Sequence, residues 1–316
     1  MKNAIVTCVT PNWLAPAAVT LLSCAQQGAS NFAELIIISF DTSEADHFNL
    51  AVFNCLHETK IKLLSISLDE LVGMGSGRLG VGSLMRLKLD VFLPDNYERV
   101  LYLDSDVLAV DDCREIFAID LERMPFAAVE SIAMLPCVKK NAPKHLEVIG
   151  TCPDHRYFNA GVMMFDWKLT KEAGLLSKSF DLLKQNPHWP FQDQDVLNRV
   201  AGRNWKLLDH KWNVTKKTAD YLALEPNLRH FNGSVKPWNS RLRFGFAKYS
   251  KYYSDSLKGT AWAEFAEQPQ KPYPFKDNWR AILRSFSFLT ILKLKNHIGL
   301  VADKGQYSEN AALVHG

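Results

Sequence analysis

The chain has 316 residues, 47% apolar and 22% charged, which is typical of a soluble globular protein and allows one large α/β core. A net charge of +3 is too small an excess for a protein that follows nucleic-acid phosphates, so we exclude that class. The six cysteines form no C-x-x-C pair and no zinc-finger spacing. Several lie in apolar runs, which predicts buried, reduced thiols.

The N-terminus resembles a lipoprotein signal only superficially. Met1-Lys2 precede a moderately apolar stretch that reaches Cys24, but Thr10-Pro11-Asn12 interrupts it with turn-forming residues. We therefore expect a strand, a turn and a helix, in a cytoplasmic protein. The sequence contains no apolar run long enough for a transmembrane helix.

The first hundred residues alternate strand-like and helix-like segments. We expect strands at 4–9, 35–40 and 62–68, with helices at 14–26 and 44–57 between them. The strand at 35–40 is almost continuously apolar, which indicates burial on both faces. The alternation predicts a doubly wound parallel sheet in this part of an α/β protein.

A glycine-rich stretch follows at 73–82. Its position is wrong for a dinucleotide-binding fingerprint, which joins the first strand to the first helix and has an acidic residue about 20 positions later. Two interpretations stay open: a mobile loop over a site, and a flexible linker.

The rest of the main domain continues the α/β pattern. A helix at 83–92 carries Arg86 and Lys88 and is stopped by Pro94, and the apolar run 99–103 leads directly into Asp104. We further expect strands at 126–130 and 161–166 and helices at 168–185 and 193–201.

The C-terminal region differs in composition. We divide the chain into a domain at 1–265 and a basic tail at 266–316. The segment 271–297 carries six Lys or Arg residues and one acid, Asp277, with apolar residues at spacings of three and four. It is either a helix packed on the domain with a solvated basic face or a helix in a membrane interface. The mixture of aromatic and basic residues favours peripheral contact with the inner membrane face.

Asp104 and Asp106 follow the apolar run 99–103 directly. In an extended strand alternate side chains point the same way, and open α/β sheets bind ligands at the carboxyl ends of their strands. Two carboxylates aimed at one point repel each other unless one is protonated, so a cation is the natural counter-charge. Oxygen ligands suit Mg²⁺ or Mn²⁺. Alone, the triplet also fits an acidic surface turn.

Three later segments add polar groups of a suitable kind. They are Asn159 and Gly161 before a predicted strand, Gln192 to Asp195 at a helix start, and His230, Gly233 and Lys236 in one loop. Singly, each could be a turn residue, a helix cap or a structural histidine. Together, the imidazole favours Mn²⁺ over Mg²⁺, and the ammonium suits a pyrophosphate.

The order of these motifs resembles that of the family 8 glycosyltransferases. The motifs are Tyr-Leu-Asp-Ser-Asp at 102–106, Tyr-Phe-Asn-Ala-Gly-Val at 157–162, Phe-Gln-Asp-Gln-Asp-Val-Leu-Asn at 191–198 and His-Phe-Asn-Gly-x-x-Lys-Pro-Trp at 230–238. The resemblance covers about residues 3–240 and is nearest to bacterial lipopolysaccharide α-galactosyl- and α-glucosyltransferases. It implies a GT-A fold with a Rossmann-like mixed sheet flanked by helices. It also implies a UDP-sugar donor, Mn²⁺, and retaining hexosyl transfer to lipopolysaccharide or another cell-surface glycan.

The resemblance assigns roles to individual residues. It makes Asp104, Asp106 and His230 the metal ligands and Lys236 the contact to the donor diphosphate. Gly233 lies in the same donor-binding loop as Lys236, and Arg86 matches an arginine that reaches the donor. It makes Asn159 a contact to the donor sugar, Asp193 and Gln194 the pair on the reacting face of the sugar, and Thr10 and Asn12 the uridine loop.

Two positions depart from the family pattern. Thr10 stands where an acidic residue is frequent, which weakens the expected recognition of uracil. Glu130 stands where we expect an aspartate, and its extra methylene could change the choice of sugar.

The expected mechanism is stabilisation of the departing UDP by the metal, Lys236 and Arg86. Retention requires either a nucleophile, for which Asp193 and Gln194 are the candidates, or attack by the acceptor on the face that UDP leaves. We favour the second route because an amide is a poor nucleophile. Two alternatives stay open: a haloacid-dehalogenase-like phosphatase that uses Asp104, and an inactive sugar-nucleotide-binding scaffold.

Overall fold

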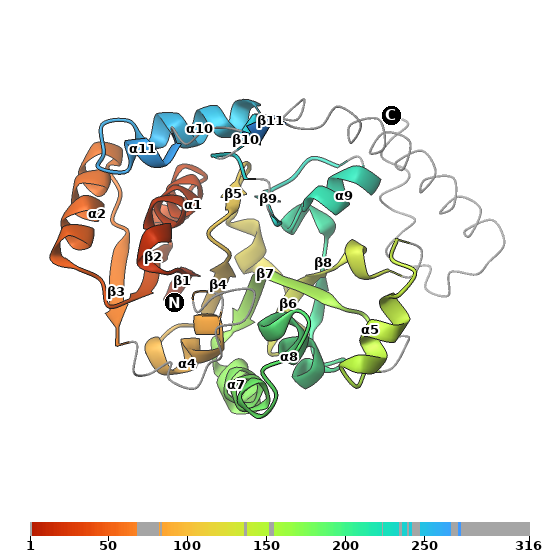
Figure 1. The fold of residues 1–316 in the computed structure, drawn as a ribbon. Helices are drawn as coiled ribbons and strands as arrows, with labels where there is room; N and C mark the ends of the chain where they lie inside the picture. The colour runs from red at the N-terminus through yellow and green to blue at the C-terminus, as the bar shows by residue number, and fades with distance from the viewer. Residues whose placement is uncertain are drawn as a thin grey trace.

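The computed structural model describes residues 2–67, 82, 84–135, 138–151, 155–222, 224–233, 236–238, 240–241, 247–266 and 271–272. Helices flank a seven-stranded sheet whose strand order is β3-β2-β1-β4-β7-β6-β8 (Figure 1). The strands are β1 (Asn3–Cys8), β2 (Ala33–Phe40), β3 (Lys62–Ile66), β4 (Arg99–Leu103), β6 (Phe126–Glu130), β7 (Phe158–Asp166) and β8 (Lys206–Leu208).

The first half of the sheet is parallel. β1 pairs in parallel with both β2 and β4, and β2 pairs in parallel with β3. The connecting helices α1 (Leu14–Gln26) and α2 (Glu44–His57) have the predicted bounds. α2 begins sharply because Ser43 and Asp46 form a reciprocal capping box. The predicted alternation of strands and helices is therefore confirmed.

The second half of the sheet is mixed, as the predicted fold class requires. β7 runs antiparallel to both β4 and β6, whereas β8 is parallel to β6. Because β7 is reversed, its first residues lie beside the last residues of β4: Leu103 pairs with Val162. A register shift between Ala128 and Val129 adjusts the pairing near the end of β6.

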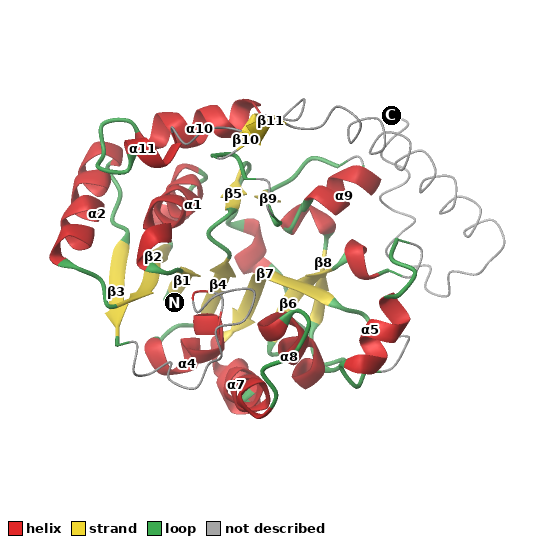
Figure 2. Cartoon of the chain, viewed as in Figure 1, coloured by secondary structure: helices red, strands yellow, loops and turns green. Residues whose placement is uncertain are grey.

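Helices and loops cover both faces of the sheet (Figure 2). Ile5 and Leu101 pack on the side of α1, whereas Val6 and Tyr102 pack on the opposite side. Burial of both faces explains why these strands are almost continuously apolar. The remaining helices are α4 (Leu89–Phe92), α5 (Ala142–Val148), α6 (Trp167–Ala173), α7 (Leu175–Gln185), α8 (Gln192–Ala201), α9 (Lys216–Tyr221), α10 (Ala247–Leu257) and α11 (Ala263–Ala266).

Three predicted elements differ in detail. The helix expected at 83–92 is a 3₁₀ turn, Met85–Lys88, followed by the short α4. The helix expected at 168–185 is two helices, because Gly174 adopts φ +61° and ends α6. β7 begins at Phe158 instead of 161, so Asn159 lies within the strand.

Some predictions fall on residues outside the described part of the chain. These are the glycine-rich stretch at 73–81, Cys137, Cys152 and most of the basic tail. Cys8, Cys24 and Cys113 are buried and free, as predicted, whereas Cys55 is free but exposed. Among the described residues, no helix combines the length and apolar character needed to cross a bilayer.

Candidate active site

The aspartates at 104 and 106 lie in a turn between β4 and β5 (Val107–Ala109). The Val107 amide donates to the Asp104 carbonyl at 3.0 Å, which closes the turn, and the Thr20 hydroxyl donates to the Ser105 carbonyl at 2.9 Å. The prediction that the two carboxylates converge is confirmed. Its premise, an extended strand with alternating side chains, is wrong, because a turn brings them together.

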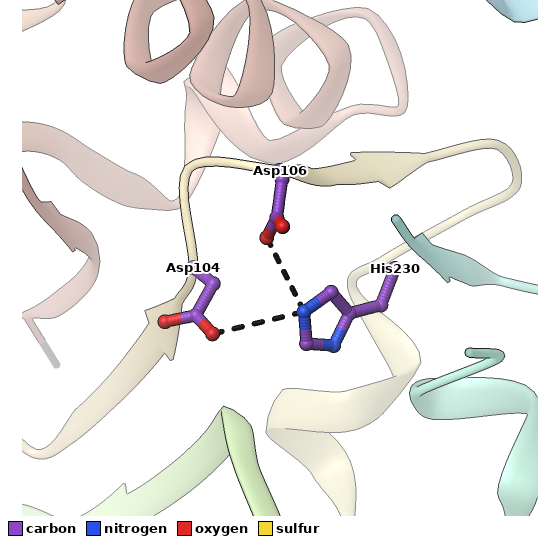
Figure 3. A group of neighbouring side chains, drawn as sticks. All are labelled: Asp104, Asp106 and His230. Atoms are coloured by element: carbon purple, nitrogen blue, oxygen red, sulfur yellow. Dashed lines mark ion pairs between the residues drawn. The ribbon is translucent and has the colours of Figure 1, made fainter. Parts of the chain in front are cut away.

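The imidazole of His230 arrives from a distant segment, β9 (Leu228–His230). β9 pairs antiparallel with β5 and places His230 opposite Val107. Its Nε2 lies 3.2 Å from Asp106 Oδ1 and 3.7 Å from Asp104 Oδ2, and Figure 3 shows both carboxylates facing this nitrogen. One potential ligand atom from each residue lies within 4.8 Å of the others. These are the three residues predicted to bind a metal.

Space for this cluster depends on Gly161. The Gly161 carbonyl accepts from the Asp104 amide at 2.8 Å. A Cβ at position 161 would lie 2.3 Å from His230 Cε1 and 2.8 Å from Asp104 Oδ2, closer than real contacts allow. The missing side chain thus admits the imidazole and a carboxylate. Two carboxylates and one imidazole fit a divalent transition metal such as Mn²⁺.

Positive charge surrounds the aspartates. Lys236 Nζ forms an ion pair with Asp106 and donates to the Phe231 carbonyl at 2.9 Å. Burial alone would raise the pKa of Asp106, but Lys236 and His230 outweigh it and hold this pKa far below its ordinary value. Gly233, in the loop between them, adopts φ +91°, a conformation that favours glycine.

Arg86 joins the cluster of Asp104, Asp106 and His230 to α8. Its Nη2 lies 2.9 Å from Asp104 Oδ1, its Nε lies 2.8 Å from Asp193 Oδ2, and its Nη1 donates to the Ala160 carbonyl at 2.6 Å. The guanidinium stacks over the Tyr102 ring at 4.6 Å, and the Tyr102 hydroxyl donates to Asp104 Oδ1 at 3.0 Å. Arg86 and Tyr102 thus occupy Asp104 Oδ1, while Oδ2 faces His230.

Asp193 lies in the first turn of α8 and is only 2% exposed. Burial raises its pKa to about 6, with nearby Asp104 acting in the same direction and Arg86 opposing both. The preceding residue, Gln192, has φ +39°, which is unusual for a residue other than glycine. Asp193 is thus a buried carboxylate whose pKa lies above its ordinary value and that forms an ion pair with Arg86.

Gln194 and Asn159 form a pair of interlocked amides. Gln194 Oε1 accepts from Asn159 Nδ2 at 3.0 Å and from the Ala160 amide at 3.1 Å. Gln194 Nε2 donates to Tyr157 Oη at 3.1 Å. Glu130 is buried at the end of β6, where Val129 pairs with Asn159. The structure therefore brings Glu130 close to the residues predicted to hold the sugar.

Thr10 and Asn12 occupy the loop after β1, at the same edge of the sheet as Asp104. The Thr10 hydroxyl donates to the Asn12 side-chain oxygen. A Cβ on Gly82 would lie 3.1 Å from the Thr10 amide, so Gly82 packs closely on this loop. The hydrogen bonds and ion pairs described above do not link this loop directly to the carboxylates.

Sequence reasoning missed several residues that hold the predicted ones. Asn213 Oδ1 lies 2.9 Å from His230 Nδ1, and Asn213 Nδ2 donates to Asn159 Oδ1 at 2.7 Å. Tyr102 and Tyr157 stand first in two of the motifs and could have been chosen for that reason. Asn213 follows Trp212 outside those motifs, and no local pattern marks it.

Comparison with known proteins identifies the family. The family model described as "Glycosyl transferase family 8" matches residues 5–241. Lipopolysaccharide 1,2-glucosyltransferase of Escherichia coli K12 is 24% identical over 61% of this chain and 59% of its own length. General stress protein A of Bacillus subtilis is 24% identical over 55% of this chain and 63% of its own length. The chain thus matches less than two thirds of either relative.

Two further comparisons extend the agreement. Lipopolysaccharide 1,3-galactosyltransferase of Salmonella typhimurium LT2 is 24% identical over 72% of this chain and 68% of its own length. The solved galactosyltransferase LgtC, in complex with donor and acceptor sugar analogs, superposes with a TM-score of 0.72 at 18% identity, over 84% of this chain and 100% of its own. At that identity the second comparison shows the fold, which is GT-A. With the family match across three quarters of the sequence, the chain belongs to glycosyltransferase family 8.

Proposed function

We propose that this protein transfers a hexose, galactose or glucose, from a UDP-sugar to a glycan acceptor with retention of configuration. The observation that carries the proposal is the cluster of Asp104, Asp106 and His230, with Lys236 at its edge. These three residues would hold Mn²⁺, or Mg²⁺ in its place. When bound, the metal supplies positive charge for the departing diphosphate.

The residues of the chain prepare the site for that departure. Lys236 places an ammonium beside Asp106, where it can contribute positive charge toward a diphosphate. Arg86 is 5% exposed and binds Asp104, Asp193 and a backbone carbonyl. We therefore assign it mainly to holding the two carboxylates in place, in addition to its expected approach to the donor.

The arrangement of amides supports attack on the face that UDP leaves. Gln194 Oε1 accepts two hydrogen bonds from the protein, and Asp193 forms an ion pair with Arg86. These contacts lower the nucleophilicity of the Gln194 amide and of the Asp193 carboxylate. In the proposed step the bond from the anomeric carbon to UDP breaks while a bond to the acceptor oxygen forms. The acceptor proton passes to the leaving diphosphate oxygen. A glycosyl group found on Asp193 or Gln194 by mass spectrometry would contradict this step.

The names of the relatives favour lipopolysaccharide or another cell-surface glycan as acceptor. We propose that residues 1–265 form the transferase domain. We further propose that the tail at 266–316 makes peripheral contact with the inner membrane face of a cytoplasmic enzyme. The phosphatase alternative requires Asp104 as nucleophile, but Asp104 Oδ1 is held by Arg86 and Tyr102, and the family match opposes it.

A donor screen tests the proposal. Purified full-length protein is incubated with Mn²⁺ and each of a panel of UDP-sugars, and released UDP is measured. We expect release from UDP-galactose or UDP-glucose, and its loss when a chelator is added. Hydrolysis of p-nitrophenyl phosphate without UDP release would support the phosphatase, and UDP-sugar binding without turnover would support the inactive scaffold.

A further inference from the structure

Asn213 connects the metal cluster to the amides of the sugar site. It follows the 3₁₀ turn His210–Trp212 and is 1% exposed. Its two side-chain atoms bind different partners: Oδ1 lies 2.9 Å from His230 Nδ1, and Nδ2 lies 2.7 Å from Asn159 Oδ1. One buried amide thus lies between a proposed metal ligand and a proposed sugar contact.

Two backbone amides fix the orientation of the neighbouring side-chain amides. The Gly161 N–H donates to Asn159 Oδ1 at 3.1 Å, and the Ala160 N–H donates to Gln194 Oε1 at 3.1 Å. A backbone N–H can only donate, so the atom that it meets must be an oxygen. Asn159 Nδ2 then donates to Gln194 Oε1, as the 3.0 Å contact requires.

The same hydrogen-bond directions determine which ring nitrogen of His230 carries a hydrogen. Asn159 Oδ1 can only accept, so Asn213 must present its NH₂ group to Asn159 and its oxygen to His230. His230 Nδ1 must therefore carry a hydrogen. Nε2 is then the nitrogen left to bind a cation, and it faces both Asp104 and Asp106 (Figure 3). Two backbone amides of β7 thus select the ring nitrogen that is available to the metal.

The hydrogen bonds beyond Gln194 run in the same direction, from donor to acceptor, as far as Asp195. Gln194 Nε2 donates to Tyr157 Oη at 3.1 Å, so the Tyr157 hydroxyl donates onward to Asp195 Oδ1 at 2.6 Å. Asp195 is fully buried and also binds His145 Nε2 at 2.8 Å. Each donor between His230 and Asp195 therefore points toward this buried carboxylate.

We propose that Asn213 is a positioning residue that fixes the Nδ1–H tautomer of His230 and couples it to the Asn159–Gln194 pair. The proposal rests on the proposed function, because it gives His230 the metal and Gln194 the sugar. Groups that orient metal-ligating histidines usually matter nearly as much as the ligands. Here the orienting group is itself oriented by the sugar site, so the imidazole and the Gln194 amide cannot reorient independently.

Two substitutions separate the two contacts of Asn213. Asn213→Leu removes both, so we expect Mn²⁺ affinity, measured by calorimetry, to fall about 10- to 100-fold. Asn213→Asp keeps an oxygen for His230 but sets a second oxygen against Asn159 Oδ1. We expect it to keep Mn²⁺ affinity within about threefold, while kcat falls about 10- to 100-fold because Gln194 is displaced.

The matched control is Asn227→Leu. Asn227 is also a buried asparagine next to β9, but its Nδ2 donates to the Asp112 carbonyl at 3.0 Å, away from the cluster. It should leave Mn²⁺ affinity unchanged. ¹⁵N NMR of histidine in the metal-free protein reports the tautomer directly, with the His230 signal assigned by its loss in His230→Gln. We expect a hydrogen on Nδ1 in the wild type, whether or not Nε2 also carries one, and a smaller Nδ1–H population in Asn213→Leu.

The readouts distinguish the two possible failures. If the wild type shows the Nδ1–H tautomer, lost in Asn213→Leu, but binds no Mn²⁺, the proposed metal fails while Asn213 keeps its positioning role. If Mn²⁺ binds and Asn213→Leu changes neither tautomer nor affinity, the inference is overturned. Should Asn213→Leu fail to fold, Asn213→Asp still tests the coupling, since an unchanged kcat would overturn it.

Discussion

The two halves of the sheet contribute different chemistry to one site. The parallel half, β3-β2-β1-β4, ends in the turn that bears Asp104 and Asp106. The mixed half contributes its amides from the first residues of β7, because β7 runs opposite to β4. The site therefore forms where the carboxyl end of one strand meets the amino end of its reversed neighbour.

The two sides of the site differ in the groups that they contribute. Asp104 and Asp106 follow the parallel half, where the carboxyl ends of strands gather ligands, whereas the carboxylates of Glu130 and Asp193 come from β6 and α8. The reversed strand presents Asn159, and its backbone N–H groups bind the neutral side chains of Asn159 and Gln194. Arg86 and Asn213 join the two sides. Substitutions that act on one side alone can therefore test whether the division is functional.

The largest loss of activity is expected from His230→Ala, which removes the imidazole that faces Asp104 and Asp106. Loss of one of three proposed ligands should lower UDP release about 1,000-fold, since metal stabilisation of the leaving group contributes several kcal/mol. His47→Ala, an exposed histidine on α2, is the control and should retain full activity. The measurement is UDP release at saturating donor with Mn²⁺. Equal activity of His230→Ala and His47→Ala would show that the cluster has no role in catalysis.

A smaller loss of function is expected from Gly161→Ala, which places a methyl group of β7 against His230 and Asp104. The new Cβ must displace His230, which it would approach to 2.3 Å. We expect Mn²⁺ affinity to fall about 100-fold, because the ligand that moves is held by a single orienting amide.

Gly202→Ala is the control for a glycine substitution. Its Cβ would meet nothing within 4 Å, although its φ of +55° is unfavourable for alanine. It should lower thermal stability while leaving Mn²⁺ affinity unchanged. If Gly161→Ala also left the affinity unchanged, the close approach of β7 to the cluster would have no role in metal binding.

The two halves of the sheet also differ in how much of each could be predicted from the sequence. Strands and helices of the parallel half follow local periodicity, and α1 and α2 have the predicted bounds. The fold class was predicted from the alternation and the resemblance together. The reversal of β7 left no such local signal, because a strand buried on both faces looks alike in either direction.

The site was predictable where motifs name its residues and unpredictable where long-range pairing supplies them. The two aspartates were predicted from the apolar strand that precedes them and His230 from the order of the motifs, and the structure brings the three together. Asn213 reaches His230 through the packing of two distant segments, which periodicity cannot reveal. The prediction of an extended backbone at Asp104 and Asp106 was wrong because the apolar pattern of β4 does not indicate the residue at which the strand ends.

Protonation of Asp193 is expected to lower activity about tenfold per pH unit. Burial raises its pKa to about 6, so its proton returns as pH falls through 6 and the pairing with Arg86 is lost. Activity should then fall about tenfold per pH unit below 6. In Asp193→Asn the activity should be lower at neutral pH and lack this limb. The measurement is kcat/KM for the donor between pH 5 and 8 (about three units, chosen to bracket the transition).

The sign of the stability effect follows from the same shift. The native pKa of Asp193 lies above its ordinary value of 3.8, so the native state binds the proton more tightly. Its favourable contribution is present below about pH 4 and is lost as pH rises through about 6. The melting temperature of Asp193→Asn relative to wild type should therefore rise between these values. A pH-independent difference would contradict the raised pKa.

The smallest effect on chemistry is expected from removal of residues 273–316. This cut leaves the pairing of β10 (Ser240–Arg241) with β11 (Lys271–Pro272) in place. UDP release should change less than about twofold, because the proposed residues all precede the cut. Binding to anionic vesicles should be lost, since the removed segment supplies basic and aromatic residues suited to a charged interface. Co-sedimentation with anionic and with neutral vesicles measures this. A full-length protein that sediments with neither would contradict a membrane role for the tail, whereas lost UDP release in the shortened chain would move the domain boundary.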